Sequence, residues 1–241
     1  MGAIDLISRR INRYLVFDRL NRRYCRWQLE QFAPYLGQRV LEIGCGVGGI
    51  IDLLGPRELV YGVDVEEDVL AYAAERFRDR PECHFQLLDI NEADTESLSQ
   101  LCKQRFDTIL CINVLEHIRD DIAALQRMEG LLAPGGTLAL LVPAHLALFG
   151  PYDKVDGHYR RYNKAYLRTI LQHTGFRLVR AHYLNAVGAL GWWVQYKLLR
   201  RSVHGEGQLG MMNKLLPLVR VSEALVKPPF GLSLVAVCRK E

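Results

Sequence analysis

A glycine-rich turn follows a short apolar stretch near residue 44. Residues 40–49 read Val-Leu-Glu-Ile-Gly-Cys-Gly-Val-Gly-Gly and lead into a helical pattern. Glycine lets the main chain approach a ligand that a Cβ atom would repel, and a helix N-terminus offers free N–H donors. Gly44, Gly46 and Gly49 also satisfy the G-x-G-x-x-G pattern, and Asp64 follows Gly44 by 20 residues, as in dinucleotide-binding turns. An NAD-dependent oxidoreductase is therefore one interpretation of this turn.

Three acidic residues stand at the ends of successive predicted strands. Glu42 interrupts an apolar strand, where an ionised carboxylate is costly unless a cation or a hydrogen-bond donor faces it. The ammonium group of an amino-acid ligand would meet that need. Asp64 ends the next strand, and Asp89 ends the third, where it could accept a hydrogen bond from the exocyclic amine of adenine. The three acids together favour a ligand that joins an amino acid to a nucleoside.

The elements that must position these residues alternate in type along the chain. Apolar positions at helical spacing predict one or two amphipathic helices within 4–35, which Gly37 ends. Short apolar runs then predict five strands, with helices between them, at 39–43, 59–63, 84–88, 108–112 and 137–142. Pro134-Gly135-Gly136 predicts a turn that ends the fourth crossover helix and starts the fifth strand. This alternation is typical of a doubly wound α/β sheet.

The second half of the chain departs from that rhythm. A polar and aromatic loop at 144–162 precedes a predicted helix at 164–173, which Gly175 ends. Strand-like runs follow at 176–183 and 233–238, and the segment between them, 184–229, is interpreted as a mostly helical insertion. We therefore expect one domain over 1–241, with a helical cap (1–37), a Rossmann-like core (38–183), the insertion (184–229) and a terminal strand (230–241).

Composition narrows the class of protein. The 241 residues are 49% hydrophobic and 24% charged, which fits a compact globular domain. A net charge of +4 is too mild to indicate a nucleic-acid partner. The six cysteines form no C-x-x-C pair and complete no zinc-ligand spacing, so reduced thiols in a cytoplasmic protein are expected. No signal peptide is expected at the N-terminus, and the longest apolar stretch falls short of the ~20 residues that span a bilayer.

At the glycine turn and its acids the chain resembles the class I S-adenosylmethionine-dependent methyltransferases. The resemblance covers residues 40–175 and adds the strand at 233–238. It implies a mostly parallel seven-stranded sheet with an antiparallel last strand. It also implies S-adenosylmethionine as cofactor and methyl transfer by in-line displacement to a small-molecule, glycan or lipid-linked acceptor. A binding module that keeps the cofactor without catalysis is an alternative, beside the oxidoreductase.

The resemblance carries roles over to individual positions. The glycine turn with Glu42 would surround the methionine part of the cofactor, Asp64 would bind the ribose hydroxyls, and Asp89 would hold the adenine. The segment 113–118 after the fourth strand would line the cofactor, and the N-terminal helices would close over it, although core packing is the alternative role for Tyr24. The cofactor-binding candidates are Tyr24, Glu42, Gly44, Gly46, Gly48, Asp64, Val65, Asp89, Ile90 and Asn113.

The acceptor should lie beside the loop at 144–162, because ligands of this topology bind at the carboxyl ends of the strands. His158 is the catalytic candidate, as a general base or an acceptor-positioning group. Alternatively, it fixes the loop by hydrogen bonds to Asp153 or Asp156. Arg161 could clamp an anionic group or belong to a solvated basic face. The substrate-binding candidates are Tyr152, His158, Arg161 and Trp192.

Other features limit the acceptor and the metal. The residues after the fourth strand, Cys111-Ile112-Asn113-Val114, lack the proline motifs of nucleic-acid methylases, so no nucleic-acid acceptor is expected. Val142-Pro143-Ala144 supplies no side-chain oxygen after the fifth strand, so no metal is expected. The insertion combines apolar residues with cations, which suits a lipid-linked acceptor or peripheral membrane contact. A helical lid or a dimer face is the alternative.

Overall fold

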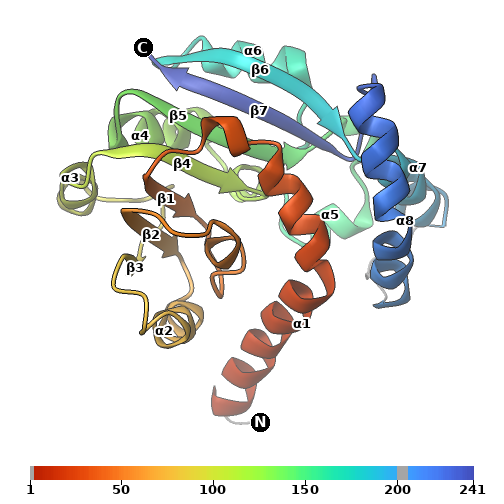
Figure 1. The fold of residues 1–241 in the computed structure, drawn as a ribbon. Helices are drawn as coiled ribbons and strands as arrows, with labels where there is room; N and C mark the ends of the chain where they lie inside the picture. Colours follow the sequence, from red (N-terminus) through yellow and green to blue (C-terminus); the bar gives the residue numbers. More distant parts are fainter. Residues whose placement is uncertain (1–2, 200–205) are drawn as a thin grey trace.

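A seven-stranded sheet forms the centre of the protein (Figure 1). The structure, a computed structural model, describes residues 3–199 and 206–241. The strands follow the order β3-β2-β1-β4-β5-β7-β6, and β7 runs antiparallel to both of its neighbours. Their bounds are β1 Arg39–Ile43, β2 Leu59–Asp64, β3 Cys83–Leu87, β4 Phe106–Ile112, β5 Leu132–Pro143, β6 Phe176–Leu184 and β7 Ser233–Lys240. The predicted mostly parallel, doubly wound sheet with an antiparallel last strand is confirmed.

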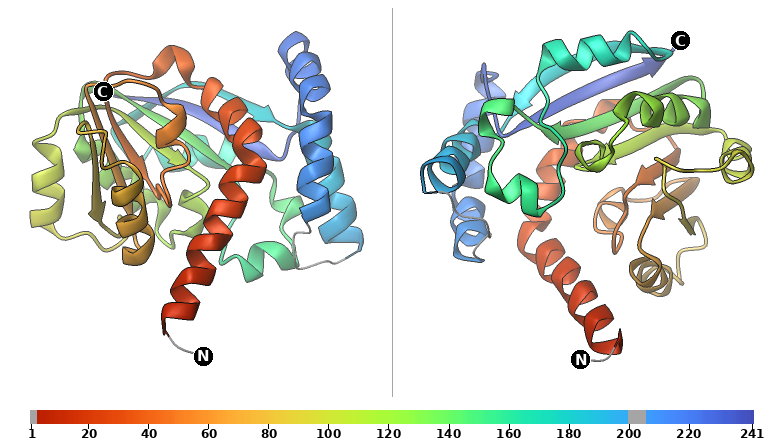
Figure 2. Two further views of the ribbon diagram at one scale, coloured as in Figure 1. Left: turned by 60° about the horizontal axis from the view of Figure 1, so that its bottom comes forward. Right: turned by 180° about the vertical axis from the view of Figure 1, so that it is seen from behind.

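Helices cover both faces of this sheet (Figures 1 and 2). Their bounds are α1 Ala3–Glu30, α2 Glu67–Arg76, α3 Thr95–Cys102, α4 Asp121–Leu131, α5 Pro151–Val155, α6 Lys164–Leu171, α7 Ala186–Trp192 and α8 Glu206–Leu225. One core joins the strands to apolar residues of α3, α4 and α6, and the other joins them to α1, α2 and α8. Because both faces are packed, the central strands read as continuous apolar runs.

Pro134, Gly135 and Gly136 differ from the prediction. They lie inside β5, whose pairing with β4 shifts register between Phe106 and Thr108. Gly135 has a φ of 71°, a left-handed conformation that glycine adopts without steric cost. The three residues therefore form an irregularity within the strand, and the strand starts at Leu132, directly after α4.

The N-terminal region forms one long helix, α1, followed by the short 3-10 turn η1 (Ala33–Tyr35). In the insertion, α7 continues into a π-helical turn, η5 (Trp193–Leu198), and α8 packs beside α1. The Glu223 carboxylate of α8 accepts hydrogen bonds from the main-chain N–H groups of Asn185 and Ala186, which joins α8 to the start of α7. No helix among the described residues is long and apolar enough to cross a membrane.

Candidate active site

The glycine turn leaves no room for side chains at two of its positions. Gly44 and Gly48 have φ angles of 73° and 78°, in the left-handed region. A Cβ atom on Gly44 would lie 2.4 Å from Cγ2 of Val114, and one on Gly48 would lie 2.4 Å from Cε2 of Phe77. The turn is therefore held against the segment after β4 on one side and against the end of α2 on the other.

Glu42 and Asp64 lie at the ends of neighbouring strands beside this turn. The Gly46 N–H donates to Asp64 Oδ2 at 2.8 Å, and the Val65 N–H donates to Asp64 Oδ1 at the same distance. Glu42 is 3% exposed, and its Oε2 has no hydrogen-bond partner within 3–199 and 206–241. Burial first, and the Asp64 charge second, raise the pKa of Glu42 well above its usual value. A cationic group on a ligand would stabilise the ionised form.

The other cofactor candidates lie along the same edge of the sheet. Asp89 is exposed after β3, and its Oδ1 accepts the Asn91 N–H at 2.8 Å, while Ile90 is buried. Val65 is exposed directly after Asp64. Asn113 follows β4 with a φ of 54°, and its N–H donates to the Leu141 carbonyl. Polar and apolar groups thus follow β2, β3 and β4 at the edge of the sheet where the sequence analysis predicts the adenosine part of the cofactor.

A tyrosine of α1 lies over the glycine turn, but it is Tyr14. A Cβ atom on Gly46 would lie 3.2 Å from Cε1 of Tyr14. Burial, and then the charges of Asp64 and Glu66, raise the pKa of Tyr14. The predicted candidate, Tyr24, accepts a hydrogen bond from Asn185 Nδ2 and packs edge-on against Trp27. The apolar pattern of α1 predicts a helix but does not indicate which of the two tyrosines faces the glycine turn.

Asp153 organises the loop at 144–162, here called the acceptor loop because the sequence predicts the acceptor beside it. It is fully buried, and its Oδ1 lies 2.9 Å from His158 Nδ1 and accepts hydrogen bonds from Arg161 Nε and Nη2 at 2.8 Å. Asp153 Oδ2 accepts the Gly150 N–H. His158 Nε2 lies 3.2 Å from Asp156 Oδ2. Burial lowers the pKa of His158, but the hydrogen bonds to Asp153 and Asp156 outweigh it and raise this pKa to about 9.

The substrate-binding candidates gather around this aspartate. The Tyr152 and Trp192 rings pack edge-on with centroids 5.1 Å apart, and the Arg161 guanidinium lies 4.5 Å from the Trp192 ring centroid. Trp192 Nε1 donates to the Leu148 carbonyl, which joins α7 to the loop. Residues from the loop and from the insertion therefore form one wall.

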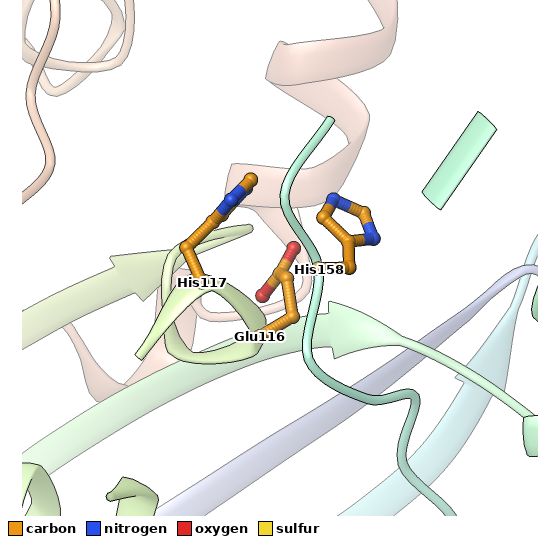
Figure 3. A group of neighbouring side chains, drawn as sticks. All are labelled: Glu116, His117 and His158. Carbon is orange, nitrogen blue, oxygen red and sulfur yellow. The ribbon is translucent and has the colours of Figure 1, made fainter. Parts of the chain in front are cut away.

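A further group completes this region (Figure 3), and the sequence analysis named only its His158 as an individual site residue. Glu116 and His117 follow β4 and meet His158 of the acceptor loop. The two imidazole rings pack edge-on with centroids 4.6 Å apart. Glu116 is 1% exposed, and burial raises its pKa to about 7. The expectation that no metal is bound rested on the lack of a side-chain oxygen in residues 142–144, and it did not take this group of three side chains into account.

Similar sequences extend over part of the chain. A family model described as a methyltransferase domain matches residues 41–138. An uncharacterized methyltransferase of Mycobacterium tuberculosis is 35% identical over 114 residues, 47% of this chain and 54% of that protein. A ubiquinone biosynthesis O-methyltransferase of Paracidovorax citrulli is 30% identical over 111 residues, 45% of this chain and 44% of that protein. The chain spans about half the length of these curated relatives.

Solved structures match nearly the whole fold. A SAM-dependent methyltransferase from Archaeoglobus fulgidus aligns with a TM-score of 0.59 at 17% identity, covering 94% of this chain and 99% of that one. The N-methyltransferase NodS of Bradyrhizobium japonicum, in complex with S-adenosyl-L-homocysteine, aligns with a TM-score of 0.57 at 18% identity, covering 92% and 87%. The methyltransferase-domain model over residues 41–138, the strand order and the shared fold of these structures all support the resemblance to the class I S-adenosylmethionine-dependent methyltransferase superfamily.

Proposed function

We propose that this protein transfers the methyl group of S-adenosylmethionine to a small-molecule, glycan or lipid-linked acceptor by in-line displacement. The observation that carries the proposal is the buried, unpaired Oε2 of Glu42, which lies beside a glycine turn and next to Asp64. A buried carboxylate oxygen without a donor is costly in the ligand-free protein. It becomes favourable when an ammonium group occupies the site, which is the group that the methionine part of this cofactor presents.

The residues of the chain fit the other parts of the cofactor. Asp64 accepts three main-chain N–H bonds, and its carboxylate can also accept the ribose hydroxyls. Asp89 would accept the adenine amine, with Val65, Ile90 and Asn113 lining the ring and the ribose. Tyr14 would cover the methionine part from α1. The cofactor supplies an activated methyl group, and the protein must align the acceptor and exclude water.

His158 is proposed to position the acceptor. Both of its ring nitrogens face carboxylates, as in the alternative in which this residue fixes the loop. Its role as a general base stays a prediction. A His158→Ala variant that binds cofactor normally and turns over at close to the wild-type rate would contradict any catalytic role, whereas at least a 10-fold loss of rate is expected.

Calorimetry with three ligands tests the cofactor. We expect heat from S-adenosylmethionine and S-adenosylhomocysteine and none from NAD. Heat from NAD alone would instead support the oxidoreductase. Product formation with a panel of hydroxyl, amine and lipid-linked acceptors then separates an enzyme from a binding module, because the module would bind the cofactor without releasing S-adenosylhomocysteine.

An apolar surface on the insertion favours an acceptor with a lipid portion. Large apolar side chains are exposed on α7, on η5 and on α8 and the segment after it: Leu190, Trp193, Val194, Leu198, Leu199, Leu215, Leu218, Val221, Leu225 and Val226. Such an area suits contact with a membrane surface or an amphipathic substrate. Trp192 of the acceptor wall lies at the end of α7, so the surface adjoins the proposed acceptor site. The cytoplasmic location stays a prediction from the cysteine pattern.

A further inference from the structure

We propose that Glu116, His117 and His158 bind a divalent transition-metal ion at the acceptor side of the site (Figure 3). One carboxylate oxygen and two imidazole nitrogens, one from each residue, all lie within 4.8 Å of one another. Tetrahedral ligands of one ion bound at about 2.1 Å lie about 3.4 Å apart. The three side chains must therefore move closer by up to about 1.4 Å to bind an ion, which rotation of the exposed His117 side chain allows. One carboxylate with two imidazoles suits Mn²⁺, Fe²⁺, Co²⁺ or Zn²⁺.

The Glu116 carboxylate supports the metal site by a second, independent observation. Glu116 is 1% exposed, and its Oε2 has no hydrogen-bond partner in the described part of the chain. The carboxylate points toward the two imidazoles in Figure 3. A buried carboxylate that points toward two imidazoles, with one oxygen that has no donor among the described residues, is the arrangement that a metal ion would satisfy.

The groups around the ligands also favour a cation. Asp153 accepts the Nδ1–H of His158, which would leave Nε2 as the ligand, as in the carboxylate–histidine–metal arrangement. Asp156 faces Nε2 and is 44% exposed, so it can give up that contact and supply a further oxygen. The positive charge of Arg161 acts on the carboxylates of Glu116 and Asp153, and that of Arg13 acts on Asp156.

The position of the site suggests what the ion would do, and this part rests on the proposed function. Glu116 follows the same turn after β4 that contacts the glycine turn through Val114. An ion held there would bind an oxygen of the acceptor and favour loss of its proton to water. The acceptor oxygen would then form the new bond to the methyl carbon as the carbon–sulfur bond breaks and the sulfur takes the electron pair. The acceptor class is therefore an alcohol, phenol or enol.

Metal binding is tested on the full chain after treatment with a chelator. Titration with Co²⁺, followed by visible absorption, and with Mn²⁺, followed by calorimetry, should show one equivalent bound through nitrogen and oxygen ligands. Glu116→Gln and His117→Asn should each weaken binding at least about 10-fold. His117 is exposed, so its substitution does not threaten the core. His173→Gln, which replaces an exposed histidine at the end of α6, is the matched control and should bind as the wild type does.

Several results would overturn the proposal: no saturable binding, a thiolate-to-cobalt absorption band, or equal affinity in wild type and both ligand variants. S-adenosylhomocysteine calorimetry on the same samples reports folding and keeps the two proposals apart. Cofactor binding without ion binding contradicts the metal site and leaves the proposed function standing. Ion binding without cofactor binding contradicts the proposed function and leaves the metal site standing.

Discussion

Glu42 places opposing demands on folding and on ligand binding. Its buried carboxylate lies next to Asp64, and both burial and that charge favour the protonated form. The raised pKa means that the folded chain holds a proton that the unfolded chain releases above its usual pKa of 4.5. The free energy of unfolding of the ligand-free protein therefore falls as the pH rises from about 4.5 toward the raised pKa. On the proposed function, a cationic ligand would offset this cost in stability.

A Glu42→Gln substitution should separate these demands. At pH 8 we expect the ligand-free variant to be more stable than the wild type by about 1–3 kcal/mol, because glutamine needs neither to take up a proton nor to bury a charge on folding. The difference should shrink as the pH falls toward and below 4.5, where the unfolded chain also takes up the proton. The affinity for S-adenosylhomocysteine should fall about 10-fold to 100-fold, the effect of losing one charge-assisted hydrogen bond. Denaturant unfolding at both pH values and calorimetry measure the two effects.

The control for this substitution is Glu92→Gln, at an exposed carboxylate on the segment after β3. It should change neither the stability nor the affinity. If Glu42→Gln leaves the affinity unchanged while raising the stability, the carboxylate does not face the ligand.

Asp153 is important for stability because it neutralises a buried cation. It accepts two hydrogen bonds from the buried Arg161 and one from Gly150, and it faces His158. Asp153→Ala leaves that guanidinium unpaired, and we expect a loss of about 3–5 kcal/mol. Asp156→Ala on the same loop should cost less than about 1 kcal/mol, because Asp156 is half-exposed. Urea unfolding of both variants measures the difference, and equal losses would contradict the role assigned to Asp153.

At the scale of elements, the glycine turn and the turn after β4 act as one unit. Gly44 and Gly55 both have left-handed φ angles, but a Cβ atom on Gly44 would overlap Val114, whereas one on Gly55 would meet nothing within 4 Å. Gly55→Ala should therefore cost about 1–2 kcal/mol from backbone strain. Gly44→Ala should cost about 2–5 kcal/mol, because overpacking adds to that strain. Similar losses in denaturant unfolding would show that the two turns are not tightly packed.

The sequence predicts elements better than the contacts between them. Apolar runs mark the strands along the chain, so the strands and the helices between them could be predicted. The place of Pro134–Gly136 inside β5 could not, because it depends on pairing with β4. The three acids could be foreseen because strand ends meet at one edge of the sheet. Tyr14, Glu116 and His117 could not be selected, because their position depends on how α1 and two loops pack.

At the scale of the whole molecule, the apolar surface of the insertion should bind anionic vesicles. Replacing both Leu218 and Leu225 with serine should weaken vesicle binding about 10-fold or more, because two exposed side chains lose apolar area. Val179→Ser, at an exposed position on β6, is the control. Cosedimentation measures the binding, and calorimetry should show unchanged affinity for S-adenosylhomocysteine. No vesicle binding by the wild type, with a concentration-dependent dimer, would assign the surface to a second copy.

The position of β7 has a consequence for how the chain folds. β7 fills the gap between β5 and β6, and among the described strands β6 pairs with β7 only. Before β7 docks, β5 presents an open, apolar edge with Leu138 and Leu140 beside it. Such an edge is a template for strands of other chains. Refolding yield should therefore fall as protein concentration rises, since self-association competes with closure of the sheet.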